Sequence, residues 1–203
     1  MEETVRAFNY LIDQGLAFYW GSSEWSPEQL TDAFSVCDRL GLAKPVMEQP
    51  QYNMIDRANF EGTLIPAIEK YGLGTTVFSP LAKGILTGKY NAGIPEGSSP
   101  RVINRLGTPA GQEILAKVEK LKAAAAQKPW IVAEKLECSL AQLALAWCLR
   151  DPVVSTVMAG ASNVDQLNEN VKAVAVVSKL SADIVDEIDV ILDNKPAVAP
   201  KFR

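Results

Sequence analysis

The sequence predicts an α/β fold: the C-terminal half of a (β/α)8 TIM-type barrel, with about four β-α units and a further C-terminal helix. Helical segments alternate with apolar, strand-like runs, which is typical of a parallel sheet covered by helices. Those runs are nearly continuous in apolar residues, which indicates burial on both faces. The chain has 203 residues, whereas a whole barrel needs about 250. We expect residues 1–203 to form one partial domain without the first four strands.

The first two predicted helices enclose the first predicted strand. Apolar residues recur at helical spacing from Val5 to Ile12, which predicts a helix over residues 1–15 that ends at a glycine. The apolar run 16–23 predicts a short buried strand. Residues 26–41 predict a second helix, because a Ser-Pro pair opens this segment and a glycine ends it.

The middle of the chain repeats the alternation. Residues 44–53 predict a strand with a polar end, and residues 62–72 predict a helix. Pro66 is tolerable in that helix only near its first turn. Residues 75–81 predict a third strand, and the segment 82–108 is rich in Gly, Pro and Ser, which predicts a long loop.

The last third of the chain predicts four helices and one strand. Two helices over residues 110–127 and 139–150 precede a strand over 153–162, and helices over 163–174 and 181–192 follow it. An open four-stranded α/β sheet is the alternative to a half-barrel. A Rossmann fold has little support, because no G-x-G-x-x-G motif follows a strand.

Composition excludes several functional classes. The net charge of −4 argues against nucleic acid or an anionic membrane surface as a partner. The chain has no histidine, which excludes a histidine base and histidine-ligated metals, and we expect no metal site. No apolar run is long enough for direct membrane insertion. Three widely spaced cysteines are typical of reduced thiols, and with no signal segment at the N-terminus we expect a cytoplasmic protein.

Polar residues follow each predicted strand, at the end of a parallel barrel where ligands bind. The strongest candidate is GASNVDQLNEN, a Gly-Ala-Ser loop that leads into a helix whose free N–H groups can bind phosphate. In this segment Ser162 and Gln166 lie four residues apart, on one helix face. The alternative is that Ser162 or Asn163 is only an N-cap.

Two further segments could contact a ligand. In FSPLAKGILTGKY, Lys83 and Lys89 could meet phosphate oxygens, or could equally be solvated loop lysines. In EQPQYNM, Gln49 could direct its amide into the barrel mouth and bind a carboxamide. Its alternative is a polar strand end bonded to backbone.

Taken together, six segments resemble the aldo-keto reductase family. They are GSSEWSPEQL, EQPQYNM, FSPLAKGILTGKYNAGIP, LAQLALAWCLR, GASNVDQLNEN and NKP…FR. The closest subgroup is that of the voltage-gated potassium-channel beta subunits and their plant, fungal and bacterial relatives. The resemblance covers essentially the whole chain, and it implies a (β/α)8 barrel that binds NADP(H) across its C-terminal face and reduces aldehydes and ketones.

The resemblance also implies a cofactor-binding set. Ser23 and Gln49 match positions that hold the nicotinamide amide, and Phe78 matches an aromatic, often Trp, on the nicotinamide ring. Lys83 stands where this subgroup often has a small residue. The matching phosphate, adenosine and adenine positions are Ser79, Pro80, Leu81, Ala82 and Lys83 over the pyrophosphate, Lys89 and Arg101 near the phosphates, and Gly160, Ser162, Gln166, Glu169 and Asn170 at the 2′-phosphate and adenine.

The family's catalytic Asp, Tyr, Lys and His or Asn come from its first four strands, and none of the five tyrosines here replaces that acid. The first hypothesis is therefore the cofactor-binding half of a reductase of small-molecule carbonyl substrates, with negligible activity alone. The second is a non-catalytic, potassium-channel beta-subunit-like protein that binds a channel alpha subunit or forms a homo-oligomer. The third is that open strand edges and an uncovered apolar face prevent stable folding.

Overall fold

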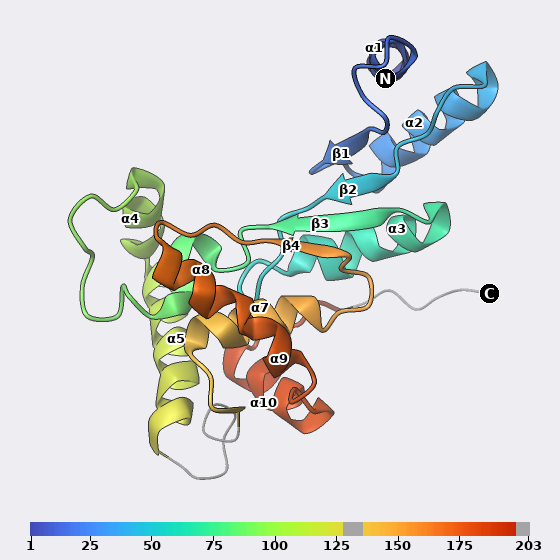
Figure 1. The fold of residues 1–203 in the computed structure, drawn as a ribbon. Helices are drawn as coiled ribbons and strands as arrows, with labels where there is room; N and C mark the ends of the chain where they lie inside the picture. Colours follow the sequence, from blue (N-terminus) through green and yellow to red (C-terminus); the bar gives the residue numbers. More distant parts are fainter. Residues whose placement is uncertain (128–135, 198–203) are drawn as a thin grey trace.

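The computed structural model describes residues 1–127 and 136–197, which form an α/β fold around a parallel sheet of four strands (Figure 1). The strands lie side by side in chain order. The register aligns Ser23 with Gln49, and Phe78 with Met158, so the carboxyl ends of neighbouring strands lie at one edge of the sheet. The strands are β1 (Gly21–Ser23), β2 (Met47–Gln49), β3 (Gly74–Phe78) and β4 (Thr156–Met158).

Helices follow the strands as the alternating sequence predicts. In Figure 1, α7, α9 and α10 gather on the β4 side of the sheet, while α1 lies at the far end, beyond β1. The helices are α1 (Glu2–Asp13), α2 (Pro27–Leu40), α3 (Ile65–Tyr71), α4 (Pro100–Leu106), α5 (Pro109–Gln127), α7 (Leu140–Leu149), α8 (Val164–Val171), α9 (Ala173–Val177) and α10 (Ala182–Leu192), with a π-helical turn η1 (Phe60–Leu64) and a 3-10 segment η2 (Ala82–Thr87).

Local capping explains why the predicted helices begin and end where they do. Ser26 accepts a hydrogen bond from the backbone N–H of Gln29, whose side chain accepts one from Ser26 in return. Ser139 and Gln142 form the same reciprocal pair at the start of α7. Gly41 ends α2 in the left-handed conformation that glycine adopts without a steric penalty.

The predicted strands are too long at several ends. Residues 16–20 do not extend β1, and Leu16, Phe18 and Tyr19 project into solvent with 74%, 89% and 74% of their surface exposed. β2 and β4 likewise have three residues each. Apolar composition alone cannot show where a strand loses its hydrogen-bonding neighbour.

Two helical predictions are also corrected. The segment 82–108 is not all loop, because it contains η2 and α4. The helix predicted over 163–174 is two helices, α8 and α9, with Lys172 between them. At the third helix, Pro66 lies at the second position of α3, as expected, and the π-helical turn η1 precedes it.

In the core, a buried arginine lies between two acids. Arg57 is 2% exposed, and its guanidinium lies 2.9 Å from a Glu61 carboxylate oxygen and 2.5 Å from one of Asp189 on α10. The guanidinium also lies 4.8 Å from the centre of the Trp147 ring on α7. This cluster connects the chain after β2 with the two C-terminal helices α7 and α10.

None of the helices in the described part of the chain is long and apolar enough to cross a membrane.

Acid should weaken the fold through Asp189. Burial alone raises the pKa of this carboxyl, but hydrogen bonds from Lys195 and Arg57 outweigh burial and hold the pKa below its usual 3.8. The stabilisation is therefore complete above about pH 4 and is lost as the pH falls through the lower folded pKa. Asp189→Asn should lower the free energy of unfolding by about 3 kcal/mol at pH 7 and flatten its fall below pH 4.

Denaturant titrations between pH 3 and 7 test this expectation. Asp186→Asn, at an exposed position of the same helix, is the matched control and should leave both the stability and its acid dependence near those of the wild type. Equal acid dependence of wild type and Asp189→Asn would contradict the assignment.

Candidate functional site

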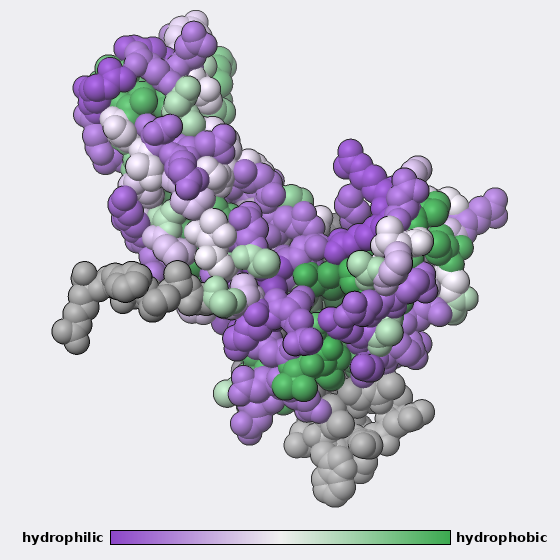
Figure 2. Space-filling view, turned by 180° about the vertical axis from the view of Figure 1, so that it is seen from behind, coloured by the Kyte–Doolittle hydropathy of each residue, from purple (hydrophilic) through white to green (hydrophobic). Residues whose placement is uncertain are grey.

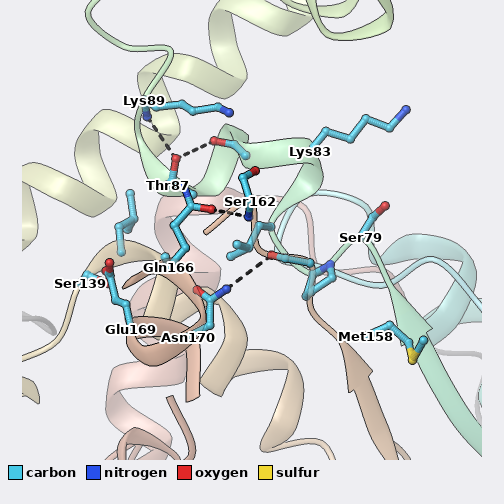
Figure 3. A pocket seen from close by; sticks show the side chains of 16 residues that line it. Ser79, Lys83, Thr87, Lys89, Ser139, Met158, Ser162, Gln166, Glu169 and Asn170 are labelled. Atoms are coloured by element: carbon cyan, nitrogen blue, oxygen red, sulfur yellow. Dashed lines mark hydrogen bonds between the residues drawn. The ribbon is translucent and has the colours of Figure 1, made fainter. Parts of the chain in front are cut away.

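A pocket lies where β3 and β4 end, at the carboxyl edge of the sheet. Its volume is about 690 Å³. Three segments line it: the chain after β3, the first turn of α7, and the chain from the end of β4 into α8 (Figure 3). The lining residues are Ser79, Pro80, Leu81, Lys83, Gly84, Thr87, Lys89, Ser139, Leu140, Ala141, Met158, Gly160, Ser162, Gln166, Glu169 and Asn170.

The chain after β3 is held in an unusual backbone conformation. Ser79, Ala82 and Lys83 have φ values of 56°, 47° and 56°, and Gly84 follows at 88°. Left-handed non-glycine residues cost on the order of 1 kcal/mol each and persist where the surroundings impose them. Here the Ala82 N–H donates to the Ser79 carbonyl at 2.9 Å, and the Gly84 N–H donates to the Leu81 carbonyl at 2.8 Å.

A buried asparagine in the turn after β2 anchors this loop. The Asn53 amide nitrogen donates to the Ser79 carbonyl at 3.0 Å, and its carbonyl oxygen accepts from the N–H groups of Ile55 and Asp56. Asn53 is fully buried. It therefore joins the turn after β2 to the turn after β3, and the sequence analysis did not single it out.

The start of α8 forms the opposite wall. Asn163 is the N-cap, and its side chain accepts from the Gln166 N–H at 2.9 Å. The Gln166 side-chain carbonyl accepts from the Ser162 N–H at 2.9 Å. Asn163 is thus an N-cap, which was the alternative interpretation of this segment. The side chains of Ser162 and Gln166 lie at the pocket, as Figure 3 shows.

Further contacts fix α8 on its neighbours. The Gln142 amide donates to the Glu169 carbonyl at 3.0 Å, which ties α8 to α7. The Asn170 amide lies 3.5 Å from the Gly160 carbonyl, across the turn that precedes the helix. Gln142, which also caps the start of α7, therefore holds α8 in place as a wall of the pocket.

Two lysines supply positive charge at the pocket. Lys83 and Lys89 are both exposed, and neither forms an ion pair with any described residue. The Lys89 ammonium lies 4.9 Å from the centre of the Tyr90 ring, and its stem packs on Gly84. In Figure 3 Lys83 extends away from Ser162, so Lys89 is the better placed cation.

The structure brings ten of the fifteen predicted residues to this pocket and leaves five outside its lining. Ser23 and Gln49 form a separate row at the ends of β1 and β2. The Ser23 hydroxyl donates to the backbone carbonyl of Gln49 at 2.9 Å. The side-chain amide of Gln49 donates to the Thr76 hydroxyl at 3.2 Å. The other three are Phe78 at the end of β3, the buried Ala82 and the exposed Arg101 on α4.

Six lining residues escaped the sequence analysis: Gly84, Thr87, Ser139, Leu140, Ala141 and Met158. Ser139 carried a usable signal, because its Ser-x-x-Gln spacing marks a helix start, and helix starts can bind anions. The described residues include no group of three or more Cys, Asp or Glu side chains arranged to hold a metal ion.

Comparisons with known proteins define the class. Residues 1–193 match the model of the aldo/keto reductase family. The chain belongs to this family, and its partial (β/α)8 architecture is consistent with that membership.

Particular relatives narrow the resemblance. A probable voltage-gated potassium channel subunit beta from Arabidopsis thaliana and another from Oryza sativa subsp. japonica are each 43% identical over 203 residues, which is 100% of this chain and 61% of each relative. A putative voltage-gated potassium channel subunit beta from Schizosaccharomyces pombe is 46% identical over 201 residues, 97% of this chain and 56% of that protein. The chain thus spans about three-fifths of the length of these relatives.

Replacing Gly84 should disturb the loop that carries both lysines. An added Cβ would lie 2.7 Å from the Lys89 Cε, and alanine would be strained at a φ of 88°. Gly84→Ala should lower the free energy of unfolding by about 1–2 kcal/mol, or roughly 2–8 °C in Tm.

Thermal unfolding with Gly97→Ala as control separates strain from contact. Gly97 has a similar φ of 76° and nothing within 4 Å of the added Cβ. In this variant the free energy of unfolding should therefore fall only by the cost of the left-handed backbone conformation. An identical loss in both variants would show that the Lys89 contact has no energetic consequence.

Proposed function

We propose that this chain forms the phosphate- and adenosine-binding part of an NADP(H)-dependent aldo/keto reductase-type oxidoreductase that acts on small aldehydes and ketones. The observation that carries the proposal is the pocket that Lys89 and Lys83 line together with Ser162 and Gln166 at the start of α8. Membership of the aldo/keto reductase family supports the same reaction class.

The pocket residues suit an anionic, polar nucleotide. A helix start offers the positive end of a dipole, and here the Ser162 hydroxyl and the Lys89 ammonium are two donors for phosphate oxygens. Gln166, Glu169 and Asn170 add amide and carboxylate groups for the adenosine hydroxyls and ring nitrogens. We assign the 2′-phosphate to the Ser162 and Gln166 side of the pocket.

The nicotinamide end would lie along the row at β1 and β2. Ser23 and Gln49 would hold the carboxamide, with Phe78 against the ring, and Arg101 on α4 would contact the phosphates. The Gln49 side-chain amide nitrogen already donates to Thr76, so the Gln49 side-chain carbonyl oxygen would be the group that accepts from the carboxamide. When bound, NADPH supplies a hydride for the carbonyl carbon of the substrate.

Reduction of a carbonyl also needs a proton donor beside the developing alkoxide. The phenol of Tyr52 donates instead to Glu61 at 2.7 Å, and burial raises its pKa. The Tyr90 phenol donates to the Lys83 backbone and that of Tyr71 to Thr31, while Tyr10 and Tyr19 lie at exposed N-terminal positions. We infer that these 203 residues bind the cofactor and need groups supplied by another part of the barrel for turnover.

A second candidate function rests on the names of the relatives, which are described as potassium channel beta subunits. In this role the chain would act in the cytoplasm as a binding protein for a channel alpha subunit, with the cofactor as a bound ligand. A pull-down with a channel's cytoplasmic domain tests it, and recovery of no channel fragment would count against the binding role.

NADPH should bind the isolated chain, and the pocket variants should weaken binding selectively. Removing a charge-assisted hydrogen bond with Lys89→Ala should raise the Kd for NADPH about tenfold. Ser162→Ala and Gln166→Ala should weaken NADPH more than NADH, because only NADPH carries the 2′-phosphate. Fluorescence titration of both nucleotides measures these constants.

Lys172→Ala is the matched control, since Lys172 ends α8 outside the pocket. It should leave both affinities unchanged. NADPH and NADH affinities that fall together in Ser162→Ala would place the 2′-phosphate elsewhere.

The purified chain should reduce nitrobenzaldehyde-type substrates at a negligible rate, even with saturating NADPH. Loss of nucleotide absorbance at 340 nm gives the rate. If the substrate were instead reduced rapidly by the purified chain, and Gln49→Ala abolished this activity, the proton donor would have to lie within this chain, which would contradict the prediction.

A further inference from the structure

Glu48 on β2 is a buried acid with which no described cation forms an ion pair. Hydrophilic residues cover much of the face drawn in Figure 2, whereas Glu48 is fully buried. Arg57, which is also buried, has two carboxylate partners. None of the ion pairs among residues 1–127 and 136–197 includes Glu48. Its carboxylate therefore depends on hydrogen bonds, because burying a charge without them is costly.

The two oxygens of Glu48 bind the two sides of one turn. One oxygen accepts a hydrogen bond from the Ser22 hydroxyl on β1, and the other accepts one from the Trp25 N–H at 3.2 Å. Ser23 and Glu24 lie between these two donors in the sequence. One carboxylate therefore fixes both ends of the short segment that contains Ser23.

A second carboxylate crosses in the opposite direction. Glu24 has a φ of 58°, a conformation that a non-glycine residue keeps only where its surroundings impose it. Its side chain accepts a hydrogen bond at 2.5 Å from the N–H of Gln51, in the chain after β2. Glu48 thus reaches from β2 into the turn after β1, and Glu24 reaches from that turn to the chain after β2.

These contacts lie on the opposite face of the sheet from the row that Ser23 and Gln49 form. The register pairs Ser22 with Glu48, and Ser23 with Gln49. Successive side chains of a strand point to opposite faces, so Glu48 lies on the buried face of β2 while Gln49 lies on the same face as Ser23. The contact between Ser22 and Glu48 on the buried face therefore sets the separation of Ser23 and Gln49 on the other.

We propose that Glu48 is a positioning residue for the nicotinamide carboxamide. Its hydrogen bonds to Ser22 and Trp25 hold Ser23 at the distance from Gln49 that this amide group needs. The inference rests on the proposed function, in which Ser23 and Gln49 bind the carboxamide. Glu48 itself faces away from the ligand, so it acts only through the turn that it fixes.

Two nucleotides separate this role from a general contribution to stability. NADPH and 2′,5′-ADP share the adenosine with its 2′-phosphate, but only NADPH has a nicotinamide. A change confined to the turn after β1 alters the binding of NADPH and leaves the binding of 2′,5′-ADP at Lys89 and Ser162 as it was. A general loss of structure weakens the binding of both.

Isothermal titration calorimetry of the 203-residue chain with both nucleotides tests the proposal. Glu48→Met keeps the size of the side chain without its oxygens. This variant should raise the Kd for NADPH about tenfold and that for 2′,5′-ADP less than about twofold. Glu48→Gln should bind NADPH more tightly than Glu48→Met, because its carbonyl can still accept from the Trp25 N–H and its amide can donate to the Ser22 hydroxyl.

Thr75→Val is the matched control. Thr75 is the fully buried register partner of Glu48 on β3, and its hydroxyl donates to the Val153 carbonyl instead of to the turn after β1. The variant should leave the ratio of the two Kd values unchanged. The double variant Ser22→Ala with Glu48→Met should bind NADPH no more weakly than Glu48→Met alone, because both changes remove the same contact.

The possible outcomes distinguish this inference from the proposed function. If Glu48→Met weakens both nucleotides equally, or neither, the positioning role is overturned, while binding of 2′,5′-ADP by the wild type still supports the proposed function. A wild type that binds 2′,5′-ADP as tightly as NADPH overturns the positioning role too, because the nicotinamide end then adds nothing to the affinity. A wild type that binds neither nucleotide refutes the proposed function and, with it, this inference.

Discussion

The buried guanidinium of Arg57 connects segments that are far apart in the sequence. Its two carboxylate partners lie on η1 and on α10, and the Trp147 ring of α7 lies against it. A buried charge is tolerated only with such partners, so the chain after β2 has one position relative to the C-terminal helices. That same stretch contains Asn53, which holds the loop after β3. The ionic centre thus fixes, through Asn53, the wall of the pocket that carries the lysines.

Much of the fold follows from local chemistry that the sequence displays. Ser26 with Gln29 and Ser139 with Gln142 are complete helix-start signals, and the glycines after α2 and α3 are complete stop signals. Strand ends are less predictable, because a strand exists only where a neighbour supplies hydrogen bonds. Residues 16–20 have a strand-like composition, yet they lie outside β1 because no described strand pairs with them. The helix α4 was missed because its glycine- and proline-rich surroundings suggested a loop.

The candidate site was predictable in part for the same reason. Helix starts and lysine-rich turns are local features, so the sequence pointed to Ser162, Gln166 and Lys89. Thr87 and Met158 join the pocket only through the way η2 and β4 pack together. The carbonyl of Gln166 is occupied by the backbone of Ser162, so the group that the residue offers at the pocket is its amide. The spacing of residues in the sequence could not show that the Gln166 carbonyl is bonded within the chain while its amide nitrogen faces the pocket.

The strand order also has a consequence for how the chain folds. Each described strand pairs with the next strand along the sequence. Each pair in this sheet can therefore form as soon as the second of its two strands has been synthesised. Paired residues lie 26 positions apart between β1 and β2 and 80 apart between β3 and β4, and the pairs can form one after another as a ribosome releases the chain. Arg57 is then the late event, because its partner Asp189 is synthesised 132 residues after it. We expect a nascent chain that has a formed sheet before its ionic centre is complete.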